Sequence, residues 1–376
     1  MTSMLLAHAE QIITKVSQSE LPVVGTPLTA FVAAIMAMFG VFLFYHLIEH
    51  LPRPKKNRIT LQKEMVYVKA MISFVVLAMT AGAWDVWWHR AIGRDTLWEA
   101  PHIFLYSFAI LGIITGLYVW LHTREKIWKR IALFILIVPL TAPFDNFWHT
   151  LFGVEDLTRP ISLSWAPPHA ALSLSALVTL ILLLKVLTKN RKTPDFGFFG
   201  SMTFGSILGI ILFLIMPFHP TEGWGAVAGF AGAGAFGAAL VGVMLWCQKV
   251  MQGRIDATFM MLFTILFFAV SYDKYIAPQI QVLPHDRPPF WLNIFAFMLS
   301  AIFMDISRGR LAGITRGFIA GGIWSGLLLG FATRFFVPEL QYGWMEISIA
   351  VLSGSVGGAA VGAIFDHYSK KEQVNK

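Results

Sequence analysis

The stretch Trp84-Asp85-Val86-Trp87-Trp88-His89 organises this chain, because a close copy of it, Phe144-Asp145-Asn146-Phe147-Trp148-His149, follows later in the sequence. The first copy leads to Gly93 and then to Trp98-Glu99-Ala100-Pro101-His102. The second copy leads to Gly153 and then to Trp165-Ala166-Pro167-Pro168-His169. Both copies therefore read Asp-x3-His-x3-Gly followed by Trp-x2-Pro-His, and they differ mainly in the length of the connecting loop.

The spacing of the acidic and imidazole side chains suits a metal ion. An Asp and a His four positions apart lie on one face of a helix, with roughly 5–6 Å between their Cβ atoms. The closing His follows a proline, which suits the first turn of the next helix, so the hairpin can aim all three side chains at one point. One carboxylate and two imidazoles are a ligand set for copper, iron or zinc. The predicted metal ligands are Asp85, His89, His102, Asp145, His149 and His169.

The loops between the motifs carry further polar residues. Arg94, Asp95 and Thr96 lie in the first connecting loop, and Asp156 lies in the second. A side chain such as Asp95 or Thr96 could hold the free ring nitrogen of a ligand histidine and so fix its orientation. Two alternatives stay open: an ordinary ion pair between Arg94 and Asp95, and interfacial or helix-capping roles for the individual Asp and His residues of the motifs.

The composition is that of a membrane protein. Of the 376 residues, 56% are hydrophobic and only 13% are charged, and the mean hydropathy is +0.66. These values exclude an ordinary soluble domain and predict an all-α, polytopic helix bundle within the lipid bilayer. The net charge of +8 does not indicate a nucleic-acid partner, because the basic residues occupy short loops between apolar segments. The single Cys247 excludes a disulfide framework and any all-cysteine zinc or iron–sulfur site.

Apolar segments of roughly 20 residues, the length that crosses a bilayer, recur from end to end and predict about eleven transmembrane helices. Residues 1–22, which precede the first segment, are expected to form a short amphipathic surface helix rather than a signal peptide. The predicted spans lie near residues 26–50, 66–91, 100–122, 127–151, 167–188, 197–217, 224–249, 256–276, 289–306, 311–333 and 344–366.

The basic loops predict the orientation of these spans. Every second loop is basic, and the positive-inside rule makes that side cytoplasmic. The chain is then a multi-pass protein of the cell membrane with its N-terminus outside and its C-terminus inside, and both Asp-x3-His motifs face outward. Because the hairpins 66–122 and 127–188 run the same way through the membrane, they form a parallel repeat. The basic positions are Arg53, Lys55, Lys56, Arg58, Arg124, Lys126, Lys129, Arg130, Lys189, Arg191, Lys192, Lys249, Arg254, Arg308, Arg310, Lys370 and Lys371.

The sequence divides into an N-terminal segment and two membrane halves. Residues 1–22 form the segment, residues 23–192 hold the metal motifs, and residues 193–376 form a glycine-rich scaffold. Glycines every four positions in the scaffold half predict closely packed helices; they include Gly313, Gly317, Gly321, Gly354, Gly358 and Gly362. Its outer loops contain His219, Glu222 and His285, which are either additional ligands or loop residues in water.

Asp85-x3-His89, the run Arg94-Asp95-Thr96 and the pair Pro101-His102 resemble the signature of the C subunit of copper membrane monooxygenases, the methane and ammonia monooxygenase group. The resemblance covers about twenty residues and implies that Asp85, His89 and His102 bind a metal ion close to the site of oxygen activation. This chain departs from the family pattern in three ways. Proline directly precedes the closing histidine, the chain is longer than a C subunit, and the motif occurs twice, with Arg-Asp-Thr missing from the second copy.

These observations predict an integral membrane metalloprotein with outward-facing Asp-His-His sites. We expect copper, with iron or zinc as alternatives, and a monooxygenase-like oxidation of a small or apolar substrate that draws on an electron donor or a partner subunit. Intramembrane ionisable residues also mark transport pathways. A transporter or metal-handling protein, or a non-catalytic subunit of a membrane oxidase complex, are therefore the alternative functions.

Overall fold

The structure is a computed structural model that describes residues 59–91, 99–152, 165–215, 225–266, 290–327 and 343–374, with isolated positions between 39 and 51. Within these ranges the chain forms helices joined by turns, and no β-strand occurs among them. The prediction of an all-α helix bundle is therefore confirmed for the described part of the chain. The predicted amphipathic segment 1–22 lies outside it.

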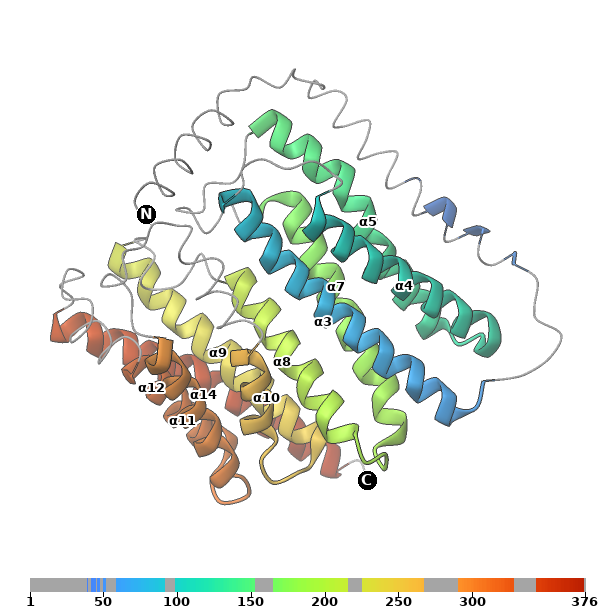
Figure 1. The fold of residues 1–376 in the computed structure, drawn as a ribbon. Coiled ribbons are helices and arrows are strands. Elements are labelled where there is room, and N and C mark those ends of the chain that lie inside the picture. The colour runs from blue at the N-terminus through green and yellow to red at the C-terminus, as the bar shows by residue number, and fades with distance from the viewer. Residues whose placement is uncertain are drawn as a thin grey trace, which may run out of the picture. The chain divides into compact units, whose positions relative to one another are not determined.

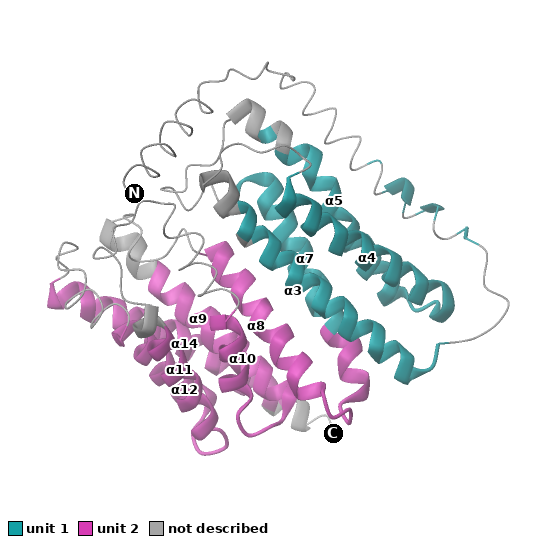
Figure 2. Ribbon diagram, viewed as in Figure 1, with its two compact units in different colours: residues 1–183 teal, residues 184–376 magenta. Residues whose placement is uncertain are grey.

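The chain divides into two compact units, residues 1–183 and 184–376 (Figure 2). In the first unit α4 packs against both α3 and α5, and these helices run alongside one another (Figure 1). The helix α7 begins in the first unit and ends just beyond its limit. The predicted limit at residue 192 between the membrane halves stays a prediction. The described helices that begin in this unit are α3 (Leu61–Ala91), α4 (Ala100–Thr123), α5 (Lys126–Phe152) and α7 (Pro167–Leu187).

In the second unit, α14 packs against α9 on one side and against α12 on another, while α10 packs against α8, α9 and α11. The described elements of this unit are the short 3-10 helix η1 (Thr188–Asn190) and the helices α8 (Phe196–Ile215), α9 (Gly225–Met251), α10 (Asp256–Thr264), α11 (Phe290–Ile306), α12 (Gly313–Ser325) and α14 (Trp344–Val374).

Seven of the described helices are long and apolar enough to cross a membrane, as expected of a multi-pass membrane protein. They coincide with seven of the predicted spans, those carried by α3, α4, α5, α7, α8, α9 and α14. The predicted spans 256–276 and 311–333 extend beyond the described residues, and 26–50 lies mostly outside them. The total of eleven spans therefore stays a prediction.

Helix α3 begins earlier than its apolar sequence suggests. The predicted span started at residue 66, whereas α3 starts at Leu61. The Thr60 hydroxyl accepts a hydrogen bond from the Lys63 backbone N–H at 3.4 Å, as an N-capping residue does. The polar first turn is also held by packing, because the buried Glu64 carboxylate accepts a 2.7 Å hydrogen bond from the Trp128 indole of α5. Hydropathy alone could not place this start.

Glycines bring α12 and α14 into backbone contact. A Cβ atom added to Gly317 would overlap the carbonyl oxygen of Gly358, and one added to Gly321 would overlap that of Gly354. The pairs run in opposite order along the two helices, so α12 and α14 are antiparallel. Helix α14 also contacts α9 through Gly357, where an added Cβ would overlap the Gly234 carbonyl oxygen. The close packing expected from the four-residue glycine spacing is therefore present on two sides of α14.

Candidate metal site

The first sequence motif brings Asp85 and His102 together. Asp85 lies near the C-terminal end of α3, and His102 is the third residue of α4. The His102 Nε2 atom lies 3.1 Å from the Asp85 Oδ1 atom. That oxygen is shielded from solvent, and the His102 side chain is buried as well. The hairpin predicted from the sequence therefore aims its carboxylate and its closing imidazole at each other.

The second motif repeats this pairing. Asp145 lies near the C-terminal end of α5, and His169 is the third residue of α7. The His169 Nε2 atom lies 3.5 Å from the Asp145 Oδ1 atom, which is again shielded from solvent. Two separate stretches of the sequence thus each place an aspartate near the C-terminal end of one helix against a histidine in the first turn of another.

The backbone at the two histidines is also equivalent. In the first copy the Ile103 N–H donates to the Glu99 carbonyl at 2.9 Å, and in the second the Ala170 N–H donates to the Ala166 carbonyl at 2.9 Å. Each bond runs from the residue after the histidine to the residue three before it. A proline precedes each histidine in the first turn, where the missing N–H has no intrahelical partner to lose. The sequence therefore presents both imidazoles from the first turn, as predicted.

Both pairs lie at the ends of apolar helix segments. Asp85 and Asp145 lie near the C-terminal ends of α3 and α5, and the apolar segments of α4 and α7 begin at Ala100 and Pro167. In a bilayer this position corresponds to the boundary between hydrocarbon and head groups. A carboxylate at this depth is costly to keep ionised without a partner, and the imidazole supplies one.

The distances between the paired atoms fit two ligands of one metal ion. Metal bonds to imidazole nitrogen or carboxylate oxygen are about 2.0–2.2 Å long, so two such ligands at angles of about 90–120° lie about 2.8–3.8 Å apart. Both observed separations, 3.1 Å and 3.5 Å, fall within this range. The first separation also has the usual length of a direct N–H···O hydrogen bond, about 2.7–3.2 Å, and the second is longer than that.

The other predicted ligands are placed only in part. His89 belongs to α3 and His149 to α5, each four positions after the paired aspartate and so on the same helix face, but their side chains lie outside the described part of the structure. Among the side chains that are described, no group of three or more His, Cys, Asp or Glu residues is close enough to hold a metal ion. The remaining candidates also lie outside the described residues: Arg94, Asp95, Thr96, Asp156, His219, Glu222 and His285.

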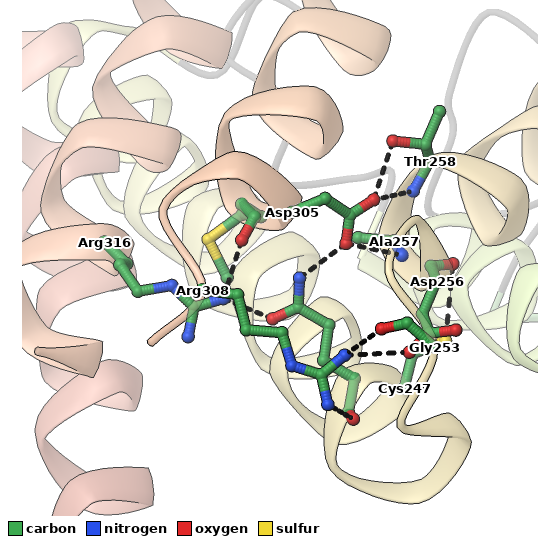
Figure 3. Close-up of polar contacts among 10 residues, drawn as sticks. Cys247, Gly253, Asp256, Ala257, Thr258, Asp305, Arg308 and Arg316 are labelled. Carbon is green, nitrogen blue, oxygen red and sulfur yellow. Dashed lines mark hydrogen bonds and ion pairs between the residues drawn. The ribbon is translucent and has the colours of Figure 1, made fainter. Parts of the chain in front are cut away.

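A second polar cluster, which the sequence analysis did not single out, lies in the other unit and centres on Asp305 of α11 (Figure 3). One carboxylate oxygen of Asp305 accepts hydrogen bonds from the Gln248 amide at 2.7 Å and from the Ala257 N–H at 3.1 Å. The other accepts from the Thr258 N–H at 2.8 Å and from the Thr258 hydroxyl at 2.7 Å. A carboxylate from one helix thus caps the N-terminus of another, α10.

Two arginines complete this cluster. The Arg316 guanidinium donates to the Gln248 side-chain carbonyl and, at 2.8 Å, to the Met304 backbone carbonyl. Arg308 pairs with Asp256 at 3.0 Å (Figure 3). The bonds join α9, α10, α11 and α12, so the cluster is a structural clamp. In the sequence, this cluster is indicated by two acidic residues, Asp256 and Asp305, each of which lies next to a loop whose charged residues are all basic.

The apolar helices and the polar pairs at their ends define a multi-pass α-helical membrane protein. Comparison with protein-family models, with characterised proteins and with solved structures found no match to this chain. Its function is therefore inferred from its own residues and their geometry.

Proposed function

We propose that this protein is an integral membrane metalloprotein in which each Asp–His pair holds a metal ion. The observation that carries the proposal is the second pair: Asp145 and His169 reproduce the arrangement of Asp85 and His102 at ligand distance, from different helices. A single Asp–His contact at a helix end has many explanations. Two such contacts, both made by the same repeated sequence pattern, are better explained by a common function of the two pairs.

The third ligand in each site is the histidine four positions after the aspartate, His89 or His149. The electrostatics of the helix ends favour this assignment. The C-terminal ends of α3 and α5 carry partial negative charge, which stabilises a cation near Asp85 and Asp145. The closing histidines lie in the first turns of α4 and α7 and would bind the metal ion through a deprotonated ring nitrogen.

We propose copper because of the resemblance to copper membrane monooxygenases. Iron and zinc are the alternatives, because two imidazoles and one carboxylate suit all three metals. The bound metal would supply oxygen activation, as the resemblance to copper membrane monooxygenases implies. Aromatic side chains make the surroundings of each pair apolar. Trp84 packs edge-on against Phe104 beside the first pair, and Phe144 packs edge-on against Trp148 beside the second, each with ring centroids 6.3 Å apart. Such surroundings favour oxidation of a small or apolar substrate.

The metal sites face the outside of the cell membrane in this proposal, and the eleven spans place the C-terminus in the cytoplasm. A reporter that functions only in the cytoplasm is expected to be active when it is fused after Lys376. The positive-inside rule assigns the side with the basic loops to the cytoplasm, and the C-terminus is predicted to lie on that side. An epitope tag inserted in the 154–163 loop is expected to be accessible on intact cells or spheroplasts. A 154–163 tag that is reached only after permeabilisation would invert the orientation.

Asp85→Asn tests whether the first pair holds a metal ion. The substitution keeps the size of the side chain and removes its charge, so the protein should insert and fold. We expect it to bind metal at least about 10-fold more weakly and to lose substrate-dependent oxygen uptake in parallel. The measurement is metal content by elemental analysis of purified protein, together with a competitive metal titration.

Glu125→Gln is the matched control, because it removes a charge from an exposed position in the loop between α4 and α5. Its metal content should equal that of the wild type. If Asp85→Asn retained a full metal complement, Asp85 would not be a ligand and the proposed oxidase would lose its main support. Metal exchange across proteoliposomes without oxygen uptake would favour a transporter instead.

A further inference from the structure

Two short loops of the second unit lie next to each other. One joins α9 to α10, and the other joins α11 to α12. Arg308 of the second loop connects them, because its guanidinium donates hydrogen bonds to the backbone carbonyl of Gly253 (Figure 3) and, at 2.7 Å, to that of Gln248 near the end of α9. Exposed side chains of the two loops therefore lie close to one another.

Both loops contain the same short pattern, a glycine, an arginine and an aliphatic residue. The pattern reads Gly253-Arg254-Ile255 just before α10 and Gly309-Arg310-Leu311 just before α12. Both arginines are exposed. The aliphatic residues are exposed as well, Ile255 by 52% and Leu311 by 42%. Each loop thus presents a positive charge directly beside an apolar side chain.

The charged groups around these two arginines already have partners. Arg308 pairs with Asp256 at 3.0 Å. Asp305 caps the start of α10, and Asp366 of α14 accepts hydrogen bonds from two successive backbone N–H groups at the start of α12, at 3.0 and 3.2 Å. Within the described part of the chain, the exposed arginine of each loop makes no side-chain hydrogen bond or ion pair. Three carboxylates are therefore engaged, and two guanidinium groups stay available for an anion from outside the chain.

The two loops directly follow apolar helix segments. The segment of α9 ends at Met251, and that of α11 ends at Ile306. In a bilayer, residues just beyond such a segment lie among the lipid head groups, and aliphatic side chains at this level reach the acyl chains. Arginine binds phosphate through paired hydrogen bonds from its planar guanidinium. Basic pockets between membrane helices at this depth recognise anionic lipid head groups.

We propose that Arg254 and Arg310 together bind the phosphate group of an anionic phospholipid, while Ile255 and Leu311 contact its acyl chains. The inference is independent of the metal sites, which belong to the other unit. An anionic lipid is favoured over a zwitterionic one, because the cationic head group of a zwitterionic lipid would lie beside the two guanidinium groups. Since the lipid contacts both loops, it would also stabilise the arrangement of α9, α10, α11 and α12.

Equilibrium binding of fluorescent phosphatidylglycerol to the purified full chain in neutral detergent micelles tests the inference. Unlabelled phosphatidylglycerol should compete for the site at least about 5-fold more strongly than phosphatidylcholine, which carries the same phosphate but no net charge. Soluble glycerol phosphate should not displace the probe, because it lacks acyl chains. Equal competition by the two lipids would overturn the inference. Displacement by glycerol phosphate at the concentration at which phosphatidylglycerol competes would also overturn it, since the site would then bind free phosphate.

The double variant Arg254→Gln, Arg310→Gln removes both charges from the site. We expect its affinity for phosphatidylglycerol to fall roughly 25-fold, about 5-fold for each arginine. The matched control is the double variant Arg191→Gln, Lys192→Gln, which removes the same charge from two exposed residues before α8. Its affinity should change by less than about 2-fold, because salt screens charges that lie outside the site. Circular dichroism establishes that both variants fold. An equal loss of affinity in the two folded variants would show a general attraction between basic loops and anionic lipid, and would exclude this site.

Discussion

Gly358→Ala is expected to destabilise the second unit by about 3 kcal/mol or more, at the upper end of the cost of overpacking a well-packed site. The added Cβ atom would overlap the carbonyl oxygen and carbon of Gly317, which are backbone atoms and cannot rotate away. The helices α12 and α14 would have to separate, and the neighbouring Gly321–Gly354 contact would open with them. The apparent free energy of unfolding in detergent micelles, from thermal or denaturant titration, measures the effect.

Gly197→Ala provides a control of opposite sign. Gly197 lies in α8, and a Cβ atom added there meets nothing within 4 Å. Replacing a helical glycine with alanine in open space should stabilise the protein by up to about 1 kcal/mol, because alanine loses less backbone entropy on folding. Equal stability changes for Gly358→Ala and Gly197→Ala would show that the predicted backbone contact between α12 and α14 does not form.

Asp305→Ala is expected to cost about 3–5 kcal/mol, the range for removing one partner from a buried charged network. The carboxylate accepts four hydrogen bonds, two of them from the backbone at the start of α10, and alanine leaves all four donors without this acceptor. Asp305→Asn keeps one oxygen and should cost less. The measurement is again unfolding in micelles, with hydrogen exchange at the Ala257 and Thr258 amides as a local readout.

Removal of a carboxylate from the exposed loop position Glu125 should change the stability by about 0.5 kcal/mol or less. This comparison separates the effect of a buried, multiply bonded carboxylate from the general effect of changing the net charge. If Asp305→Ala were no more destabilising than Glu125→Ala, the cluster in Figure 3 would not hold the ends of α9, α10, α11 and α12 together.

The repeated motif predicted the Asp85–His102 and Asp145–His169 pairs because its spacing depends only on local helix geometry. Helical periodicity fixes which positions share a face, and a proline fixes where the next helix starts, so a short sequence determines where the paired side chains lie. The glycine contacts between α12 and α14 were predictable for the same reason. In each case the regular spacing of residues along a helix places them on one face, and this predicts which residues make the contact.

Contacts made by single residues between helices were not predictable in this way. Asp305 binds Gln248 and Thr258, which are far from it in sequence, and no periodic pattern links the three. The early start of α3 at Leu61 has the same origin. Its polar first turn is stabilised by one hydrogen bond between Glu64 and Trp128, which a hydropathy profile does not register. Only the three-dimensional arrangement brings such partners together.

The position of α14 between α9 and α12 has a consequence for the order of biosynthesis. At about 5–20 residues per second, the stretch between Met251 and Trp344 takes on the order of 10 s to translate. During that time the glycine surfaces of α9 lack their partner and must be accommodated by lipid or by the membrane insertion machinery. The second unit can therefore complete its packing only after Trp344–Val374 has been translated, and a nascent chain interrupted before Trp344 should be recognised and degraded by membrane proteases.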